Sequence, residues 1–424
     1  MESLRSVYPG QTKVALETLG CKLNQAESEL ISKQLEEAGF MLVDSVEQAD
    51  ICLLNTCTVT HVADRKARHI LQMNHRRNPH AKLVALGCYA ERAAGDLSAI
   101  PGVDLVVNNH EKNNLVKLLD KLNDVKTKVI IPARRETGRT RTFVKAQDGC
   151  SNYCTYCIVP FVRGSEKSLL PDEVIREIND RVDKGYQEIV LTGTEIGKYQ
   201  CEGIGLSGLL ERILAETKIK RLRLSSLQPR EVTSELIGLW QDERLCSHFH
   251  LALQSGSDSV LQRMGRCYLT RDYAAAAELI RSRVPDAAIT TDVIVGFPGE
   301  TGAEFSESLD FCRRMRFARI HVFSYSARQG TAAARLPDRV KGSEKKRRSA
   351  QMLELGARSL AAFHSLYAGK TLAVLFEGSK KNLWLGYTGN YLKVQVESGE
   401  NLTNRIMPVK LFGRMRDGMN GELV

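Results

Sequence analysis

Long apolar runs are missing from this chain of 424 residues, of which 43% are apolar and 26% are charged. No segment approaches the run of about 18 apolar residues that a membrane-spanning helix requires. The opening residues, MESLRSVYPGQTK, also lack the apolar core of a secretory signal, so we expect a soluble cytoplasmic protein with no membrane partner. Disulfides are not expected in that reducing compartment. The composition is globular, and the length predicts two to four domains.

Histidine is absent between His110 and His248, although the chain contains 11 cysteines. Three cysteines lie within the stretch GCSNYCTYC. Structural zinc takes four ligands, usually in two close pairs, and this stretch has no second pair. Cubane iron–sulfur clusters bind thiolates at short loop spacings, and three protein ligands leave one iron free for another group. The stretch therefore predicts an iron–sulfur cluster rather than zinc. The predicted ligands are Cys150, Cys154 and Cys157.

Three further cysteines, Cys21, Cys57 and Cys88, each follow a short apolar segment that predicts a buried strand: KVALETLG, ADICLLNT and KLVALG. Helical patterns follow the first two, and the spacings of 36 and 31 residues suit βαβ units of about 30 residues. Parallel α/β sheets bind ligands beyond the carboxyl ends of their strands, so we expect the three thiols to converge on one cluster. The alternative is that they are small buried residues, as we expect for Cys52 inside its strand.

Beyond the central cysteines, helical patterns alternate with strand segments such as EIVLTGTEIG, RLRLSSLQP and AAITTDVIVGFPGE. This alternation predicts a parallel α/β barrel, full or partial, with its site at the carboxyl ends of the strands. Candidates for cofactor contacts lie near those ends, although each suits a helix cap or a turn equally well. They are Thr192, Gly193, Thr194, Ser226, Gln254 and Asp292. Cys201, Cys246, Cys267 and Cys312 show no metal-ligand spacing and are expected to be packing residues.

From Lys370 onward, short alternating strands with Gly and Asn turns predict a small closed β-barrel. Residues 366–424 contain eight Lys or Arg and five Asp or Glu, and the whole chain has a net charge of +10, which indicates a polyanionic partner. Trp384, Tyr387 and Tyr391 are suited to stacking on unpaired bases or, equally, to filling the barrel. Two basic runs at the edges of the central domain are hypothesised to contact phosphates. They contain Arg134, Arg135, Arg139 and Arg141, and Lys345, Lys346, Arg347 and Arg348.

The C-x3-C-x2-C stretch, with Tyr156 before its last cysteine, resembles the signature of the radical S-adenosylmethionine (SAM) superfamily. In that superfamily the open iron chelates the amine and carboxylate of SAM. Further segments extend the resemblance over nearly the whole chain to the tRNA methylthiotransferase family. These segments are LGCKLNQAESE, NTCTVT, LGCYAE, QDGCSNYCTYCIVPFVRG, LQSGSDSVLQRMGRCY and TDVIVGFPGET.

This resemblance implies an N-terminal methylthiotransferase domain at 11–125, a basic linker at 126–140, a radical SAM core at 141–365 and a TRAM RNA-binding β-barrel at 366–424. It implies two 4Fe-4S clusters, an auxiliary one on Cys21, Cys57 and Cys88 and a radical-generating one on the central cysteines. Two SAM molecules would be used per turnover, with Tyr156 and the six strand-end residues near them. The implied partners are a tRNA anticodon stem-loop, an electron-donor protein and a sulfur source.

The form GCKLNQ, followed by NTCTVTHVADRK, is most similar to the subgroup that acts on N6-threonylcarbamoyladenosine at position 37 of tRNA. The alternatives are an isopentenyladenosine tRNA, an aspartate of a ribosomal protein, or a non-catalytic RNA-binding protein with iron–sulfur or zinc centres. Two positions depart from the subgroup pattern. Gln228 stands where Glu is expected, and TGTEIG replaces the common TG-hydrophobic-His form.

Overall fold

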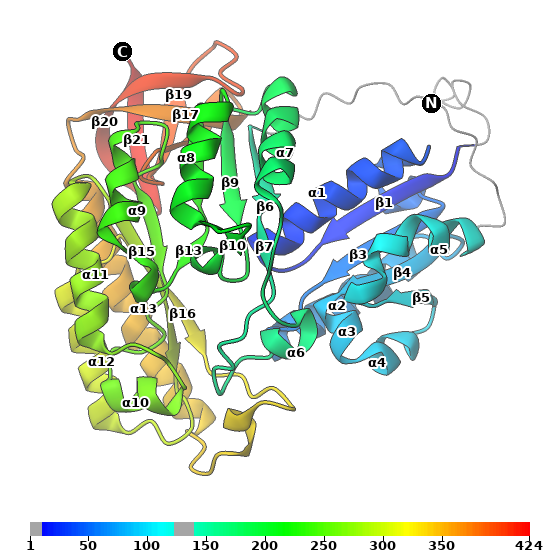
Figure 1. Cartoon of the computed structure of the whole chain (residues 1–424), viewed down its shortest axis with the longest axis horizontal. Coiled ribbons are helices and arrows are strands. Elements are labelled where there is room, and N and C mark those ends of the chain that lie inside the picture. The colour runs from blue at the N-terminus through cyan, green and yellow to red at the C-terminus, as the bar shows by residue number, and fades with distance from the viewer. Residues whose placement is uncertain (1–10, 123–139) are drawn as a thin grey trace. The chain divides into compact units, whose positions relative to one another are not determined.

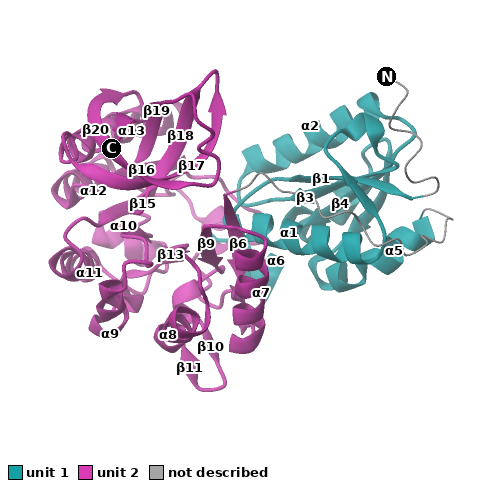
Figure 2. Ribbon diagram, turned by 90° about the horizontal axis from the view of Figure 1, so that it is seen from above, with its two compact units in different colours: residues 1–136, 157–165 teal, residues 137–156, 166–424 magenta. Residues whose placement is uncertain are grey.

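The computed structural model describes residues 11–122 and 140–424, which form two compact units (Figure 2). Unit 1 comprises Met1–Glu136 together with Cys157–Ser165, and unit 2 comprises Thr137–Tyr156 together with Glu166–Val424. Of the expected linker at 126–140, only Thr140 is among the described residues. In the described parts of the chain, every helix is too short or too polar to cross a lipid bilayer.

Unit 1 is built on a five-stranded parallel sheet with the strand order β2-β1-β3-β4-β5. The strands are β1 (Lys13–Thr18), β2 (Met41–Val43), β3 (Ile51–Thr56), β4 (Lys82–Gly87) and β5 (Val103–Val107). The helices are α1 (Lys22–Glu37), α2 (His61–Arg77), α3 (Cys88–Arg92), α4 (Ala94–Ser98), α5 (Leu115–Leu122) and α6 (Val159–Arg163). The expected N-terminal parallel α/β domain is confirmed.

Helices cover both faces of this sheet, which accounts for the burial of every residue of β3. Alternate residues of a strand point to opposite faces. Leu53 packs with Leu35 of α1, whereas Leu54 packs with Leu71 of α2 on the other side. Each such fully buried side chain stabilises the fold by roughly 1.5–3 kcal/mol.

The central part of unit 2 consists of parallel strands in two sheets, ordered β12-β9-β6 and β13-β14-β15-β16 (Figure 1). β12 (Arg221–Leu224) and β13 (Ser226–Leu227) follow each other after one residue. The other strands are β6 (Arg141–Lys145), β9 (Glu188–Thr192), β14 (His248–Leu251), β15 (Ala288–Val295) and β16 (Arg319–Ser324). Short strands β7 (Gln147–Asp148) and β8 (Lys167–Ser168) pair with each other, as do β10 (Gln200–Cys201) and β11 (Ile204–Gly205).

Helices pack on one face of these strands. They are α7 (Pro171–Asp183), α8 (Leu206–Glu216), α9 (Ser234–Gly238), α10 (Asp258–Arg263), α11 (Thr270–Arg283), α12 (Gly302–Met315) and α13 (Gly342–Ser365). Phe249 and Leu251 of β14 lie in the shared apolar core, so the alternate residues His248 and His250 belong to the opposite face, which is polar. The predicted α/β architecture of the core is confirmed.

The four cysteines expected to be packing residues do not all share one environment. Cys246 and Cys312 are buried, and burial raises the pKa of Cys312 to about 12. Cys201 is partly buried beside the same core. Cys267 is exposed, so a packing role for it is wrong.

The C-terminal residues of unit 2 form the expected closed β-barrel, with strand order β17-β18-β19-β21-β20. The strands are β17 (Thr371–Lys380), β18 (Leu383–Thr388), β19 (Lys393–Glu397), β20 (Ile406–Met415) and β21 (Gly418–Leu423). All pair in antiparallel fashion except β19 and β21, which run parallel. The closed five-stranded form is consistent with a TRAM domain.

Candidate functional site

Three thiols lie at the carboxyl end of the sheet of unit 1. Cys21 precedes α1 as its N-cap residue, Cys57 follows β3 directly, and Cys88 begins α3 after β4. β1, β3 and β4 are adjacent in the parallel sheet, so these ends lie along one edge. Gly20 brings two of the loops together, because a Cβ there would lie only 2.8 Å from Cys57 Cβ. The predicted convergence of the strand ends is thus seen in the fold.

Electrostatic coupling shows that the three thiols are close to one another. Burial raises the pKa of Cys57 to about 11, and the thiols of Cys88 and Cys21 add to that rise. Burial likewise raises the pKa of Cys88. Metal binding requires the thiolate form, so a metal group bound here would displace protons from at least two buried thiols.

The chemistry of the three thiols fits an iron–sulfur cluster. Among the described residues, the one group of three metal-ligating side chains with donor atoms within 4.8 Å of one another is Cys150, Glu166 and Glu195. A structural zinc site takes four ligands. The donor set at the sheet edge of unit 1 is three thiols, which fits an iron–sulfur cubane with one open iron.

The central cysteine stretch is divided between the two units. Cys150 and Cys154 belong to unit 2, whereas Cys157 begins the segment 157–165 of unit 1. In that segment, Ile158 and Val162 pack with Cys88. The sequence did not predict this division of the cysteine stretch between two units.

Cys150 and Cys154 are contacted by side chains of opposite charge. Cys150 Sγ lies 3.3 Å from Glu195 Oε2, and Arg266 Nη1 donates to Cys154 Sγ at 3.1 Å. Gln228 joins the two contacts, because its Nε2 donates to Glu195 Oε1 and its Oε1 accepts from Arg266 Nη2 at 2.9 Å. A chain of hydrogen bonds therefore connects the surroundings of both cysteines.

Glu195 is buried and is held by further donors. Its backbone N–H donates to Gln147 Oε1 at 2.9 Å, and Asn152 Nδ2 donates to its Oε1 at 2.6 Å. Burial, together with the adjacent Glu195 carboxylate, raises the pKa of Glu231 well above its usual value. Glu231 therefore stays largely protonated near neutral pH, which limits the repulsion between the two carboxyl groups.

Most of the candidate cofactor residues lie at or next to strand ends, whereas Asp292 lies inside β15. Thr192 ends β9, Gly193 packs against Gln147, and Thr194 Oγ1 donates to Asp148 Oδ1 at 3.3 Å. Ser226 begins β13, and the N–H of Gln254 donates to the carbonyl of Asp292 at 2.9 Å. The carboxylate of Asp292 lies 3.2 Å from His250 Nε2. Tyr156 packs against the apolar cluster of Met264 and Phe297. Their roles toward a cofactor stay predictions.

Glu195, Arg266 and Arg163 were not among the sequence candidates. The signal for Glu195 was present in TGTEIG, where a carboxylate replaces the usual His, and Gln228 contacts this very residue. The two departures from the subgroup pattern are therefore in direct contact. Arg266 and Arg163 gave no signal beyond lying inside the motifs MGRCY and PFVRG.

Trp384, Tyr387 and Tyr391 of the β-barrel are engaged in contacts within the protein. Trp384 is buried in the barrel core, and its Nε1 donates to Ser398 O at 3.1 Å. Tyr387 and Tyr391 stack at 5.1 Å between ring centroids, and the guanidinium of Arg141 lies 5.1 and 5.2 Å from their centroids. These tyrosines join the barrel to the core instead, so the base-stacking interpretation is wrong for all three.

The hypothesis for the basic runs also requires correction. Arg134, Arg135 and Arg139 lie outside the described residues. The side chain of Arg141 is 14% exposed, packs against the tyrosines and pairs with Glu377 at 2.5 Å, so it is engaged within the protein. Arg348, whose side chain is 5% exposed, pairs with Glu300 and Glu344 at 2.6 and 2.7 Å. Arg347 is exposed but pairs with Glu344, whereas Lys346 is exposed.

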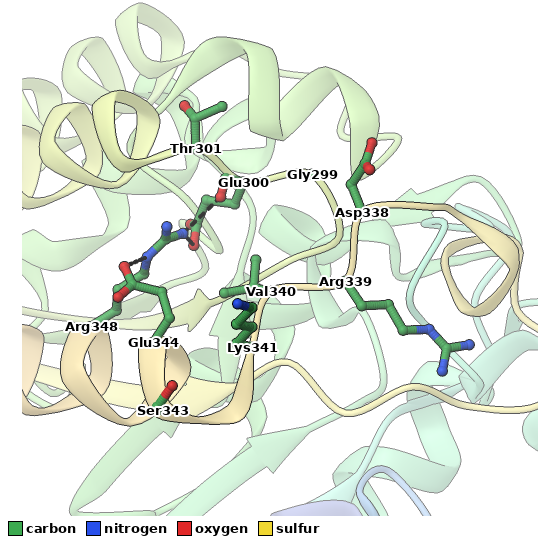
Figure 3. A pocket seen from close by; sticks show the side chains of 10 residues that line it. All are labelled: Gly299, Glu300, Thr301, Asp338, Arg339, Val340, Lys341, Ser343, Glu344 and Arg348. Carbon is green, nitrogen blue, oxygen red and sulfur yellow. Dashed lines mark hydrogen bonds and ion pairs between the residues drawn. The ribbon is translucent and has the colours of Figure 1, made fainter.

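These ion pairs line a cavity of about 660 Å³ at the start of α13 (Figure 3). Figure 3 shows Arg348 joined to Glu300 and Glu344, while Arg339 points away from them. The charge of Arg348 is therefore neutralised within the cavity wall. Its lining residues are Gly299, Glu300, Thr301, Asp338, Arg339, Val340, Lys341, Ser343, Glu344 and Arg348.

Two family profiles match the chain. Residues 13–108 match the uncharacterized protein family UPF0004, and residues 144–312 match the Radical SAM superfamily. The first region contains the three thiols of unit 1, and the second contains Cys150, Cys154 and Cys157.

Several characterised proteins are similar over almost the full chain. The threonylcarbamoyladenosine tRNA methylthiotransferase MtaB of Bacillus subtilis is 36% identical, covering 94% of this chain and 93% of that protein. The protein of the same name from Thermotoga maritima is 37% identical over 90% of both chains. A tRNA-2-methylthio-N(6)-dimethylallyladenosine synthase from Syntrophotalea carbinolica is 34% identical over 96% of this chain and 99% of that protein.

Among solved structures, the radical SAM methyltransferase TsrM of Kitasatospora setae matches with a TM-score of 0.57 at 15% identity. The match covers 76% of this chain and 77% of that one. At this identity the match shows a shared fold alone, namely that of radical SAM enzymes.

Proposed function

We propose, on the premise that this chain belongs to the radical SAM tRNA methylthiotransferase family, that it attaches a methylthio group to C2 of N6-threonylcarbamoyladenosine at position 37 of tRNA. Membership of the radical SAM superfamily implies one 4Fe-4S cluster and SAM. The observation that carries the proposal is the presence of two sets of three cysteines, one in each matched region.

In this proposal, Cys150, Cys154 and Cys157 hold the radical-generating cluster, and Cys21, Cys57 and Cys88 hold an auxiliary cluster that serves sulfur transfer. C2 of adenine has no acidic proton and no leaving group, so acid–base chemistry cannot easily functionalise it. Together with SAM, the bound clusters supply radical and sulfur chemistry, while the protein binds, orients and excludes water. Two SAM molecules are consumed per turnover, and an electron-donor protein and a sulfur source act as partners.

Residues of this chain then have distinct positioning tasks. The Arg266 guanidinium donates to Cys154 Sγ and so holds this sulfur in place. Glu195 and Gln228 fix the loops on the other side of the same site. The target base lies in the single-stranded anticodon loop, where it can be turned out toward the site at low cost.

Anaerobic reconstitution followed by nucleoside mass spectrometry tests this function. The enzyme would be incubated with SAM, a reductant and tRNA that carries either threonylcarbamoyladenosine or dimethylallyladenosine. We expect the methylthio product on the first substrate. Product on the second alone would favour the other candidate, which the 34% identity to a dimethylallyladenosine synthase supports. About eight irons per chain are expected for two cubanes, against none for a zinc protein.

The contact between Glu195 and Gln228 gives a prediction for SAM cleavage. Gln228→Glu would place a third carboxyl group beside Glu195 and Glu231 and remove the donor to Glu195. Asn152 would still donate to Glu195, but the lost hydrogen bond and the added carboxyl group should displace the loop beside Cys150. We expect SAM cleavage to fall roughly tenfold or more, which corresponds to about 1.4 kcal/mol of transition-state stabilisation. The double variant Glu195→His and Gln228→Glu restores the subgroup pattern and should recover much of that activity. A fully active Gln228→Glu single variant would contradict the pairing.

We also propose an RNA-contacting strip at the end of β20, formed by the exposed side chains of Lys410, Phe412 and Arg414 with the adjacent Arg416. All four are exposed, and Phe412 is 49% exposed. Among the described residues, Arg414 and Arg416 take part in no ion pair. An exposed aromatic ring between cations suits a polyanion with unpaired bases.

Removing this strip should weaken tRNA binding. Stacking on an aromatic side chain is worth about 1–3 kcal/mol per base, so Phe412→Ala should lower affinity about fivefold or more. Replacing Arg414 and Arg416 with alanine should reduce the slope of log affinity against log salt by about 1 for each phosphate that is no longer neutralised. Fluorescence anisotropy with labelled tRNA measures both. Arg313→Ala, an exposed cation of α12 paired with Asp310, is the matched control. Unchanged affinity and slope would exclude this surface.

A further inference from the structure

Arg163 is the last residue of α6, in the segment that follows Cys157, and its side chain is only 4% exposed. Within unit 1 its Nη1 donates to Glu27 Oε1 at 2.8 Å, and its Nη2 donates to Asn24 Oδ1 at 2.6 Å. Both partners lie on α1, the helix that Cys21 caps. A residue from the segment after the central cysteines is thus built into the three-thiol domain, 136 positions away from Glu27.

A second buried cation lies beside Arg163. Lys112 Nζ also donates to Glu27, at 2.8 Å from Oε2, and these two side chains are 11% and 7% exposed. Two cations therefore contact the same carboxylate. Partial burial weakens solvent screening, so these charges act more strongly on their neighbours than surface charges would.

Asn24 links this charge to the thiol loops. Its Oδ1, which accepts from Arg163, lies 3.7 Å from Cys21 Sγ. Its Nδ2 donates to Leu19 O at 2.7 Å and to Thr56 O at 3.0 Å, just before Cys57.

The influence of the cations reaches the third thiol as well. Burial raises the pKa of Cys88, and the charges of Arg163 and Lys112 oppose that rise.

We infer that Arg163 is a positioning residue that supplies buried positive charge at the three-thiol site and thereby stabilises its most anionic states. The inference rests on the proposed function, in which these thiols hold the auxiliary cluster. A cubane bound by three thiolates is anionic and becomes more so when it is reduced or when an anionic sulfur ligand binds. A buried cation lowers the free energy of those states and makes the reduction potential less negative.

The test isolates the auxiliary cluster in the full chain. In a background with Cys150→Ala, Cys154→Ala and Cys157→Ala, about four irons per chain should remain. Potentiometric titration followed by electron paramagnetic resonance then compares three substitutions in that background. Arg163→Met should make the reduction potential more negative, because it removes the charge but keeps most of the bulk. Arg163→Lys should stay near the parent value, and so should Arg76→Met, which removes an exposed cation of α2.

An unchanged potential in Arg163→Met would overturn the inference. If Arg163→Met does not retain iron, the reduction potential is measured on Lys112→Met instead. This variant also removes one unit of positive charge but leaves the Arg163–Asn24 contact in place. A negative shift in Lys112→Met supports the charge effect, and no shift overturns it. A background protein without any cluster would instead refute the auxiliary site itself, a result distinct from failure of Arg163 alone.

Discussion

Replacing Cys57 with alanine should abolish methylthiolation of tRNA while leaving cleavage of SAM largely intact. Cys57 lies at the end of β3 in unit 1, and the substitution leaves the central cysteine stretch complete. Iron content should fall from about eight to about four per chain. One anaerobic reaction provides both measurements: mass spectrometry of the tRNA nucleosides and chromatography of 5′-deoxyadenosine.

Two further variants define what that result means. Cys154→Ala removes a ligand of the radical-generating site, so it should abolish both product and SAM cleavage. Cys52→Ala is the matched control, because Cys52 lies within β3, the strand that Cys57 follows, and its side chain is buried in the apolar core. It should retain iron and both activities. Full product from the Cys57→Ala enzyme would refute the assignment of two clusters.

The parts of the fold that could be predicted are those that depend on local patterns of apolar and turn residues. Each strand of unit 1 that precedes a cysteine is a short apolar run, and its cysteine falls where the strand ends. Because β1, β3 and β4 are neighbours in a parallel sheet, local placement was enough to predict that Cys21, Cys57 and Cys88 would gather. The same holds for the closed β-barrel, whose turns and alternating strands are visible in sequence.

The contacts that could not be predicted join residues far apart in the chain. Arg163 meets Glu27 across 136 positions, and Arg266 meets Cys154 across 112. The periodicity of apolar residues in the sequence does not indicate such pairs, because the partners belong to different elements and only the tertiary fold brings them together. The tyrosines of the barrel show the same limit, since Tyr391 packs on the core residue His248 with 4.8 Å between ring centroids.

The hypothesis that the basic run at 345–348 contacts phosphates failed for a simpler geometric reason. Successive residues of an α-helix point about 100° apart, so a run of cations in sequence is not a patch in space. In α13, Arg347 faces solvent while Arg348 turns inward to Glu300, which lies 48 positions earlier in the chain. Burial of one arginine could be foreseen only with knowledge of its distant carboxylate partner.

Removal of Arg223 should have the largest effect on stability. Arg223 is fully buried, donates to both carboxylate oxygens of Glu188 at 2.8 and 3.1 Å, and lies 4.5 Å from the ring centroid of Tyr391. It also donates to Gly389 O at 2.9 Å, so it joins the β-barrel to the core. Breaking a buried ion pair costs about 3–5 kcal/mol, because one charge stays buried without its partner. We expect Arg223→Met to lower the free energy of unfolding by about that amount in urea denaturation, whereas Arg313→Met, in an exposed pair, should change it by less than about 1 kcal/mol.

The pH dependence of that loss identifies its cause. Burial alone would raise the pKa of Glu188, but Arg223, followed by Arg141 and Arg221, outweighs burial and holds it below its usual value. A lowered pKa in the folded state contributes stability that is full above the unfolded value of about 4.3 and is lost as pH falls through the folded value. Without Arg223 the carboxyl group takes up a proton more readily. The difference in unfolding free energy between the wild type and Arg223→Met should therefore shrink on acidification from neutral pH. A difference that does not depend on pH would mean that lost packing causes the destabilisation, rather than the loss of the ion pair with Glu188.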